Sequence, residues 1–242
     1  MDSTGEVPEA GAVAGEMRQD EARRGGREQS APQVLLLFAH PAYERSRANR
    51  ALLEAARTLP GVLVHDLYET YPDFGIDVAA EQRLLAAAPA VVLQHPLYWY
   101  SAPALVKEWL DLVLQHGWAY GHQGHALDGK RLLSVVTAGG PRSAYGSTGA
   151  NRFTLPELLR PFEQTARLCR MHWLPPFAVT GVHGMSDAEL EASVALYLEA
   201  LSFVSGEAPA EVDLASHELL NDLLEGDAAR RRRGEPSIRR EG

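Results

Sequence analysis

The sequence contains a single cysteine, Cys169, among 242 residues, so no disulfide can form within the chain. One reduced thiol is typical of a cytoplasmic protein, and its apolar neighbours predict that Cys169 is a buried packing residue rather than a nucleophile. No apolar run approaches the ~20 residues that span a bilayer. The first residues also lack the apolar stretch of a signal peptide. The sequence therefore indicates a cytoplasmic protein.

A concentrated basic face is also missing. The net charge is -9, and residues 31–204 carry 13 basic and 16 acidic side chains. Proteins that bind nucleic acid need clustered positive charge for the phosphates, so no nucleic-acid partner is expected. The overall content of 45% hydrophobic and 23% charged residues is that of an ordinary globular protein.

Both ends of the chain differ in composition from the middle. Residues 1–31 have almost no large apolar side chain and are predicted to be disordered. Residues 205–242 are read as a separate tail with a short amphipathic helix and a basic end, Arg230 to Arg233 with Arg239-Arg240. Two interpretations of the tail stay open: an added helix with a disordered, solvated end, or a docking helix with a basic patch for a membrane surface. The helical spacing is carried by Val212, Ala215, Leu219, Leu220, Leu223 and Leu224.

Residues 32–204 alternate between apolar strands and amphipathic helices. Five strands that alternate with five helices predict an α/β domain with a doubly wound parallel sheet in the strand order 2-1-3-4-5. The expected strands are 33–39, 62–67, 89–95, 131–137 and 173–180. The expected helices are 47–58, 78–88, a helix opened by Pro103, 155–170 disturbed by Pro156 and Pro161, and one opened by the capping box of Ser186 and Glu189 and running to about 203.

Three loops follow the first, third and fourth strands, and in this order those strands are neighbours. Ligands of open α/β sheets bind at the carboxyl ends of such strands. In the first loop Ser46 caps a helix whose N-terminus favours a phosphate, and Asn49, Arg47 and His40 can add hydrogen bonds or charge. Neither a P-loop nor a G-x-G-x-x-G motif is present.

The second loop contains three consecutive aromatic residues, Tyr98, Trp99 and Tyr100. Aromatic side chains are usually core residues, but three at a strand end also offer a stacking surface to a planar ring. The third loop, Thr137-Ala138-Gly139-Gly140, is either a simple turn or bare backbone placed close to a ligand. Tyr145 follows and has a hydroxyl for the same ligand edge or for a substrate. Together the loops suit a phosphorylated planar ring such as a flavin nucleotide.

Other chemistries fit the sequence less well. The segment from His116 to His125 contains three histidines, but its glycines give no fixed ligand spacing, so a mobile loop that lines a site is expected instead of a metal site. Asp73 and Asp77 are read as part of a structural turn. No G-x-S-x-G nucleophile elbow is present.

The motifs resemble those of the flavodoxin-like NAD(P)H:quinone oxidoreductases, and most closely the ancillary subunits of glutathione-regulated potassium-efflux systems. The resemblance covers about residues 33–203, outside both tails. The residues that carry it are Ala39-His40-Pro41 with Ser46, Ala48 and Asn49; Leu67-Tyr68 and Tyr71 to Asp77; Ala79 to Gln82; Gln94-His95-Pro96 with Trp99-Tyr100-Ser101; His116 to His122; Thr137 with Gly139-Gly140; and Trp173 to Ala178.

This resemblance implies a flavin-binding domain and ping-pong transfer of a hydride from NAD(P)H through bound flavin to a quinone. FMN is favoured and FAD stays open. It implies catalytic roles for Trp99, for Tyr145, and for Tyr120 and His122, which in dimeric relatives reach the partner subunit's site. Asn151 stands where the larger quinone reductases place a histidine. The implied flavin-binding residues are His40, Ser46, Arg47, Ala48, Asn49, Leu97, Tyr98, Trp99, Tyr100, Thr137, Ala138, Gly139 and Gly140.

The resemblance also implies a homodimer and, as an alternative function, an activating subunit on the cytoplasmic face of a potassium/proton antiporter, with flavin as a redox sensor. An electron-carrier flavodoxin is disfavoured, because such carriers are usually strongly acidic and need no open substrate pocket. Arg142 is a candidate to meet the phosphate of NADPH.

Overall fold

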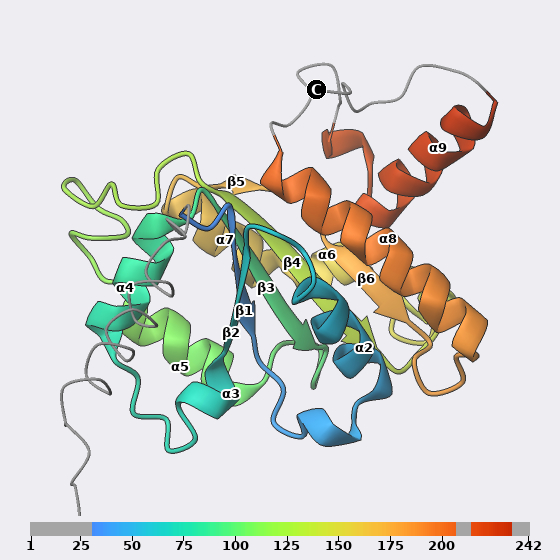
Figure 1. Cartoon of the computed structure of the whole chain (residues 1–242), viewed down its shortest axis with the longest axis horizontal. Helices are drawn as coiled ribbons and strands as arrows, with labels where there is room; N and C mark the ends of the chain where they lie inside the picture. The colour runs from blue at the N-terminus through green and yellow to red at the C-terminus, as the bar shows by residue number, and fades with distance from the viewer. Residues whose placement is uncertain (1–30, 207–213, 234–242) are drawn as a thin grey trace, which may run out of the picture. The chain divides into compact units, whose positions relative to one another are not determined.

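The computed structural model describes residues 31–206 and 214–233, and the compact unit that begins at Pro32 contains the sheet. Figure 1 shows the central sheet with helices on both faces. The strands are β1 Val34–Phe38, β2 Val62–Asp66, β3 Ala90–Pro96, β4 Arg131–Ala138, β5 His172–Trp173 and β6 Phe177–Thr180. The main helices are α2 Arg47–Ala56, α3 Leu67–Thr70, α4 Val78–Ala87, α5 Ala104–Val113, α6 Leu155–Leu158, α7 Arg160–Leu168, α8 Asp187–Ser205 and α9 Leu220–Arg232.

The sheet is parallel in every described pairing, and its order is β2-β1-β3-β4-β5, as expected. The fifth strand differs from the prediction, because it is two short strands instead of one. β5 pairs with the start of β4 and β6 with its end. Pro175 and Pro176 lie between them, and because proline has no N–H to donate to the ladder, pairing is interrupted there.

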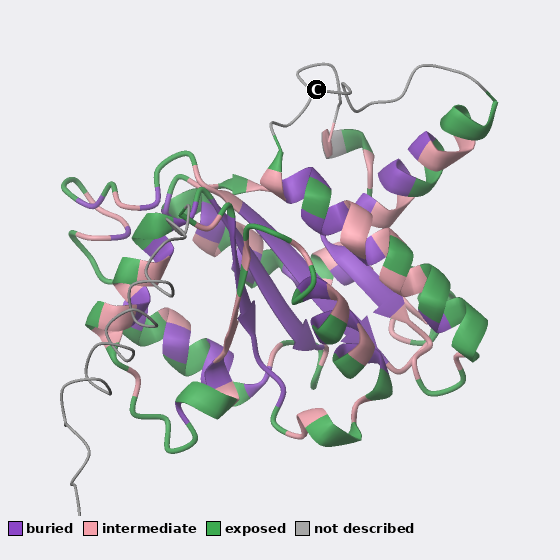
Figure 2. Cartoon of the chain, viewed as in Figure 1, coloured by how far each residue is buried: buried purple, intermediate pink, exposed green. Residues whose placement is uncertain are grey.

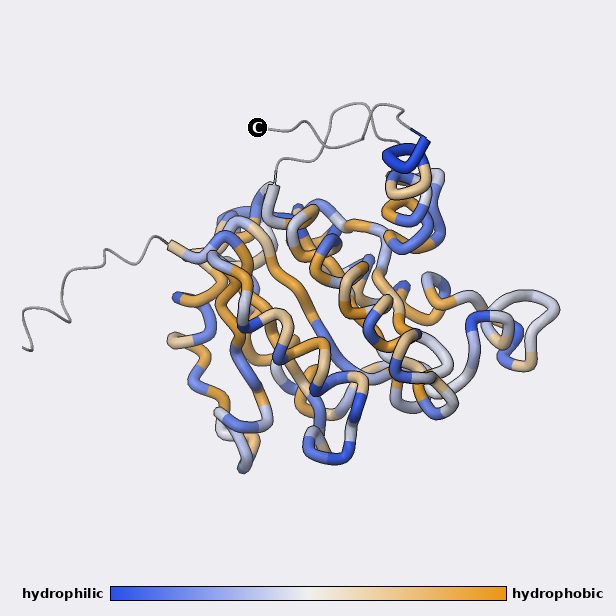
Figure 3. The backbone as a smooth tube through the Cα atoms, turned by 45° about the vertical axis from the view of Figure 1, so that its right-hand side comes forward, coloured by the Kyte–Doolittle hydropathy of each residue, from blue (hydrophilic) through white to orange (hydrophobic). Residues whose placement is uncertain are grey.

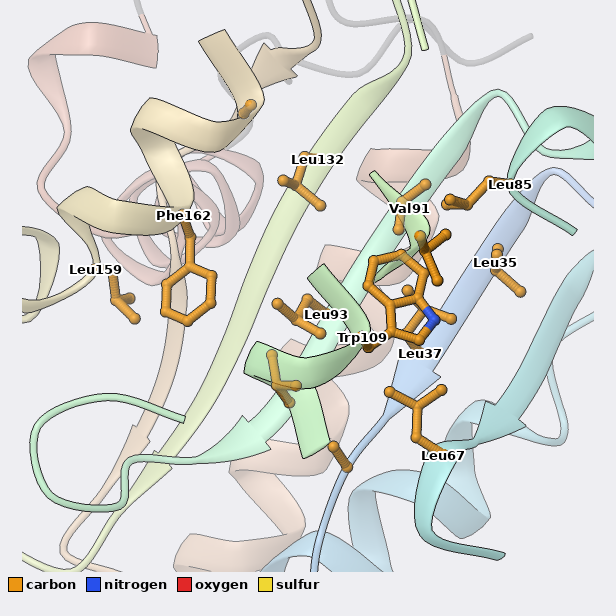
Figure 4. Packing of buried hydrophobic residues seen from close by; sticks show 14 of the residues in the cluster. Leu35, Leu37, Leu67, Leu85, Val91, Leu93, Trp109, Leu132, Leu159 and Phe162 are labelled. Atoms are coloured by element: carbon orange, nitrogen blue, oxygen red, sulfur yellow. The ribbon is translucent and has the colours of Figure 1, made fainter. Parts of the chain in front are cut away.

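Alternate residues of each central strand point to opposite faces of the sheet, and each face is covered by helices. Leu35 and Leu37 of β1 pack with residues of α3, α4, α5 and α7, whereas Val34 and Leu36 pack with α2, α8 and α9. Figure 2 shows the central strands buried along their length. Figure 4 shows Trp109 and Phe162 among the aliphatic side chains on the face of the sheet that Leu35 and Leu37 occupy. This double covering explains why the strands are continuous apolar runs.

The predicted helix ends are set by local chemistry. The hydroxyl of Ser46 caps α2, and Ser186 with Glu189 forms the expected capping box of α8. The expected helix at 155–170 is interrupted at Leu159 into α6 and α7, each with a proline in its first turn.

The buried carboxylate of Glu81, in α4, links this helix to the end of α3 and to α5. Glu81 is fully buried and accepts hydrogen bonds from His65 (2.7 Å), Tyr71 (2.6 Å) and Trp109 (2.7 Å). Burial raises the pKa of Glu81, but these donors outweigh it and leave that pKa below its ordinary value. Asp73 accepts a hydrogen bond from the N–H of Gly75 at 3.1 Å, as the turn interpretation expects, and Asp77 caps α4.

The helix expected in the tail is α9, which begins at Leu220 and packs on α8 and β6. Leu219, Leu220, Leu223 and Leu224 are buried in the core of the domain. Arg230 to Arg232, which one of the two interpretations placed in a disordered end, instead form the last turn of α9, where positive charge stabilises a helix end. Figure 3 shows this turn as the hydrophilic end of α9.

Residues 1–30 and Arg239-Arg240, on which the other predictions of disorder fall, lie outside the described residues. Cys169 is buried, as predicted. Within the described part of the chain, every helix is too short or too polar to cross a membrane.

Candidate functional site

Three loops meet at the carboxyl edge of the sheet, as the strand order requires. The N–H of Leu97, after β3, donates to the carbonyl of Thr137 at 2.8 Å. Nδ2 of Asn49, in the first turn of α2, donates to Oγ1 of Thr137 at 2.9 Å. Thr137 therefore links all three loops, and its side chain and that of Asn49 are buried.

The first loop delivers the N-terminus of α2 to this edge. Oγ of Ser46 accepts hydrogen bonds from the N–H (3.3 Å) and from Nδ2 (3.0 Å) of Asn49. Helix geometry leaves the N–H groups of Arg47 and Ala48 without partners in a preceding turn. These two groups and the helix dipole make a suitable place for a phosphate.

Arg47 has partners other than an expected phosphate. Its guanidinium donates to the carbonyls of Met185 and Ser186 and lies 3.3 Å from a carboxylate oxygen of Asp187, all at the start of α8. The side chain therefore ties α2 to α8 in this structure.

His40 is buried just after β1, and its hydrogen bonding shows which ring nitrogen carries the proton. Its Nδ1 accepts a hydrogen bond from the N–H of Ala42 at 3.0 Å, so the neutral ring carries its proton on Nε2. Burial lowers the pKa of His40, which favours this neutral form. The ring of Tyr98 meets it edge to face, with ring centres 5.8 Å apart. His40 can thus donate through Nε2.

The second loop is a tight turn that holds aromatic side chains in solvent. The N–H of Ser101 donates to the carbonyl of Tyr98, and both central residues have positive φ, 50° at Trp99 and 62° at Tyr100. Residues other than glycine adopt such φ angles at a cost of about 1–2 kcal/mol each. The exposed fractions are 40% for Tyr98, 94% for Trp99 and 53% for Tyr100. None of the three is a core residue, and the turn presents a stacking surface.

The third loop contacts a residue that the sequence reasoning missed. A Cβ at Gly139 would lie 2.5 Å from Nε2 of His183, so a larger residue here would displace that exposed ring. His183 follows β6, and the N–H groups of Gly181 and Val182 donate to the carbonyls of Gly140 and Ala138. The signal was available, because His183 lies between glycines after the fifth expected strand, at the same edge.

Tyr145 lies beside this loop. Its hydroxyl is 3.5 Å from where a Cβ of Gly140 would stand. Burial is the main cause that raises the pKa of Tyr145, Tyr100 adds to it, and the backbone of Gly140 opposes it, so the hydroxyl keeps its proton. The hydroxyl of Tyr100 donates to Oδ1 of Asn151 at 3.3 Å. The space between the second and third loops is therefore bordered by Tyr100, Tyr145 and Asn151.

Tyr120 and His122 are not brought to these loops within one chain. They lie between the end of α5 and the start of β4, which is the amino edge of the sheet, and Figure 1 shows that segment opposite the strand tips. His125 and Arg170 both contact Asp128, at 2.8 and 2.7 Å, and hold this segment in place. Among the described residues no group of histidine, cysteine or carboxylate side chains could hold a metal ion.

A groove of about 830 Å³ lies elsewhere. It runs between α6, α7 and β5 and is lined by Met171, Trp173 and Pro176 among others. None of the expected site residues lines it.

Known proteins resemble this chain across the same domain. The model of the family described as Flavodoxin-like fold matches residues 32–201. The chain belongs to this flavodoxin-like family. It is 50% identical over 171 residues to the glutathione-regulated potassium-efflux system ancillary protein KefG of Pectobacterium atrosepticum, covering 71% of this chain and 93% of that protein.

Two solved structures of similar sequence share the fold. One is general stress protein 14 of Treponema denticola in complex with FMN, with a TM-score of 0.68, 40% identity and coverage of 72% of this chain and 99% of that one. The other is an NADPH-quinone reductase from P. pentosaceus, with a TM-score of 0.64, 35% identity and coverage of 69% and 96%. The match of the family model ends at residue 201, before α9, which begins at Leu220.

Proposed function

We propose that the protein is an FMN-dependent NAD(P)H:quinone oxidoreductase. The observation that carries this proposal is the junction at Thr137, where a helix N-terminus, an exposed aromatic turn and a pair of glycines are joined at one sheet edge. Each part matches one part of a flavin nucleotide: phosphate, ring faces and polar pyrimidine edge. The likeness to an FMN complex and to a quinone reductase supports the same assignment.

The residues fit the group in a further respect. Oδ1 of Asn49 is buried and has no hydrogen-bond partner among the described residues. A buried acceptor without a partner lowers the stability of the protein unless a donor reaches it. The ribityl hydroxyls of a flavin nucleotide are such donors. Ser46 and the N–H groups of Arg47 and Ala48 would then hold the phosphate, and Nε2 of His40 would donate to the phosphate or the ribityl chain.

The ring would lie against the turn of Leu97, Tyr98, Trp99 and Tyr100, with Trp99 as the stacking residue. N–H groups of the segment Thr137, Ala138, Gly139 and Gly140 would face its pyrimidine edge and favour negative charge there. When bound, the flavin supplies two-electron chemistry, in which a hydride is taken from NAD(P)H and passed to a quinone by a ping-pong route. The proton held by Tyr145 is available to a substrate oxygen.

A homodimer would complete the site. Tyr120 and His122 lie at the opposite sheet edge of their own chain, so the catalytic roles proposed for them would be played in the site of a partner subunit. We therefore include a homodimer in the proposal.

A second function is favoured by the sequence relatives. Proteins about half identical to this chain are named ancillary proteins of a glutathione-regulated potassium-efflux system. The chain would then act at the cytoplasmic face of the membrane as an activating subunit of an antiporter, with its flavin as redox sensor. Both functions use the same flavin site and are compatible.

The deciding experiment is an absorbance spectrum of the purified protein before and after anaerobic addition of NADPH. We expect flavin bands that bleach and return when a quinone is added, and acid should release FMN. Bands that persist would favour a carrier or sensor over an oxidoreductase. Absence of flavin after reconstitution with FMN would refute the flavin site itself.

A further inference from the structure

The third loop of the candidate site is continued by a short turn that leads to Tyr145. The turn, Arg142–Ala144, is a 3-10 helix. The N–H of Ala144 donates to the carbonyl of Pro141, and the N–H of Tyr145 to that of Arg142, each at 2.9 Å. The position of Tyr145 therefore depends on where Arg142 is held.

Arg142 is held by α9. Its Nη1 and Nη2 contact the two carboxylate oxygens of Asp222 at 2.5 and 2.8 Å, and Glu218 lies 3.7 Å away. Such a two-point contact fixes the plane of a guanidinium as well as its position. The hydrogen bond from Arg142 is the main cause that lowers the pKa of Asp222. The pair is partly exposed, so its role is geometric more than stabilising.

The helix that carries Asp222 is itself firmly attached. The amide of Asn221 bonds both to the N–H (2.9 Å) and to the carbonyl (3.0 Å) of Ala178 in β6, as a neighbouring strand would. The N–H of Leu220 donates to the carbonyl of Pro176, and the leucines of α9 are buried. α9 therefore covers the open edge of β6 and presents Asp222 from a fixed base.

We propose that the C-terminal helix α9 positions the third loop of the site, with Arg142 as the positioning residue and Asp222 as its anchor. The proposal rests on the proposed flavin site. The path runs from β6 through Asn221 and Asp222 to Arg142, and from Arg142 through one helical turn to Tyr145 and Gly140. α9 lies beyond residues 32–201, which the family model matches.

The same contacts argue against the role that the sequence suggests for Arg142, which is to bind the phosphate of NADPH. Asp222 and Glu218 contact it, and Glu225 adds a third negative charge nearby. A guanidinium surrounded in this way is not free for the phosphate of NADPH. Arg142 thus acts on the site through the loop and not through the co-substrate.

The test compares Asp222→Asn with the wild-type protein. Asparagine keeps an oxygen for the N–H of Leu219, which Asp222 now accepts at 3.3 Å, but removes the charge that holds Arg142. Amide hydrogen exchange of the peptide spanning 139–151 is measured on the flavin-free protein. We expect exchange about three- to fivefold faster, as the loss of a partly exposed ion pair predicts, and weaker FMN binding by a similar factor.

Asp128→Asn is the matched control. Asp128 pairs with Arg170 at 2.7 Å, and the two side chains are 38% and 39% exposed, so this variant breaks an ion pair of similar exposure that does not touch the third loop or α9. It should leave exchange of 139–151 unchanged.

Unchanged exchange in Asp222→Asn, or an equal effect of Asp128→Asn, would overturn the proposal. Faster exchange with unchanged FMN affinity would also overturn it, because the loop would then be loosened without consequence for the site. If the wild-type protein binds no FMN at all, the proposed function fails, and the exchange data alone decide whether α9 holds the loop.

Discussion

Nδ2 of Asn49 donates to the hydroxyl of Thr137 across 88 positions of sequence, at 2.9 Å and out of contact with solvent. The bond joins the helix N-terminus after β1 to the glycine pair after β4. It explains how a phosphate site and a ring site become parts of one surface.

Replacing Asn49 by alanine should weaken FMN binding by about tenfold and lower stability by about 1–3 kcal/mol, since a buried Thr137 hydroxyl and the cap at Ser46 both lose a partner. Fluorescence titration with FMN and urea unfolding measure the two effects. Arg50→Ala is the control, because Arg50 is exposed on the same helix. FMN affinity within twofold of wild type would contradict the assignment of this junction to the flavin.

Gly139→Ala should destabilise the protein slightly and impair FMN binding, because the new methyl group would displace the exposed ring of His183. The double variant Gly139→Ala with His183→Ala should recover both properties, since only that ring stands within 3 Å of the new Cβ. Thermal unfolding and FMN titration are the measurements. A double variant that regains stability but not FMN affinity would mean that the ligand itself requires glycine.

The stability of the protein should depend on pH through His95. This ring is completely buried, and burial lowers its pKa from 6.5 to about 4. In the unfolded chain the ring takes up a proton near pH 6.5. His95 therefore contributes stability above that pH, and the contribution is lost as pH falls toward 4.

Between those limits His95 should account for a decline of roughly 3 kcal/mol. The measurement is urea unfolding of wild type and His95→Leu from pH 7.5 to pH 4. The leucine variant should show the smaller decline, whereas His122→Gln, at an exposed histidine, should match wild type. Equal slopes for wild type and His95→Leu would refute the prediction.

Two substitutions at Trp99 separate backbone strain from stacking. Trp99→Gly and Trp99→Ala both remove the ring, but only glycine accepts a φ of 50° without strain. The glycine variant should be more stable than the alanine variant by about 1 kcal/mol, while both should bind FMN about tenfold less tightly than wild type. Equal stabilities would contradict the strain, and unaltered FMN affinity would contradict the stacking role.

The sequence by itself determined the order of the elements, because the signals are local. Continuous apolar runs marked the buried strands, Ser46 and Ser186 marked two helix starts, and Pro156 and Pro161 marked the broken helix. Since parallel strands end at one edge, the three loops could be placed together before any side-chain position was known.

Only the tertiary structure decided which side chains face each other. Arg47 is bound by the start of α8, Gly139 is matched to His183, and Arg142 is bound by Asp222. Each of these partners lies more than 40 residues away, and no spacing rule connects them. The split of the fifth strand likewise shows only in its pairing with β4. Periodicity and caps act within a few residues, whereas these contacts arise from the folded arrangement of the whole domain.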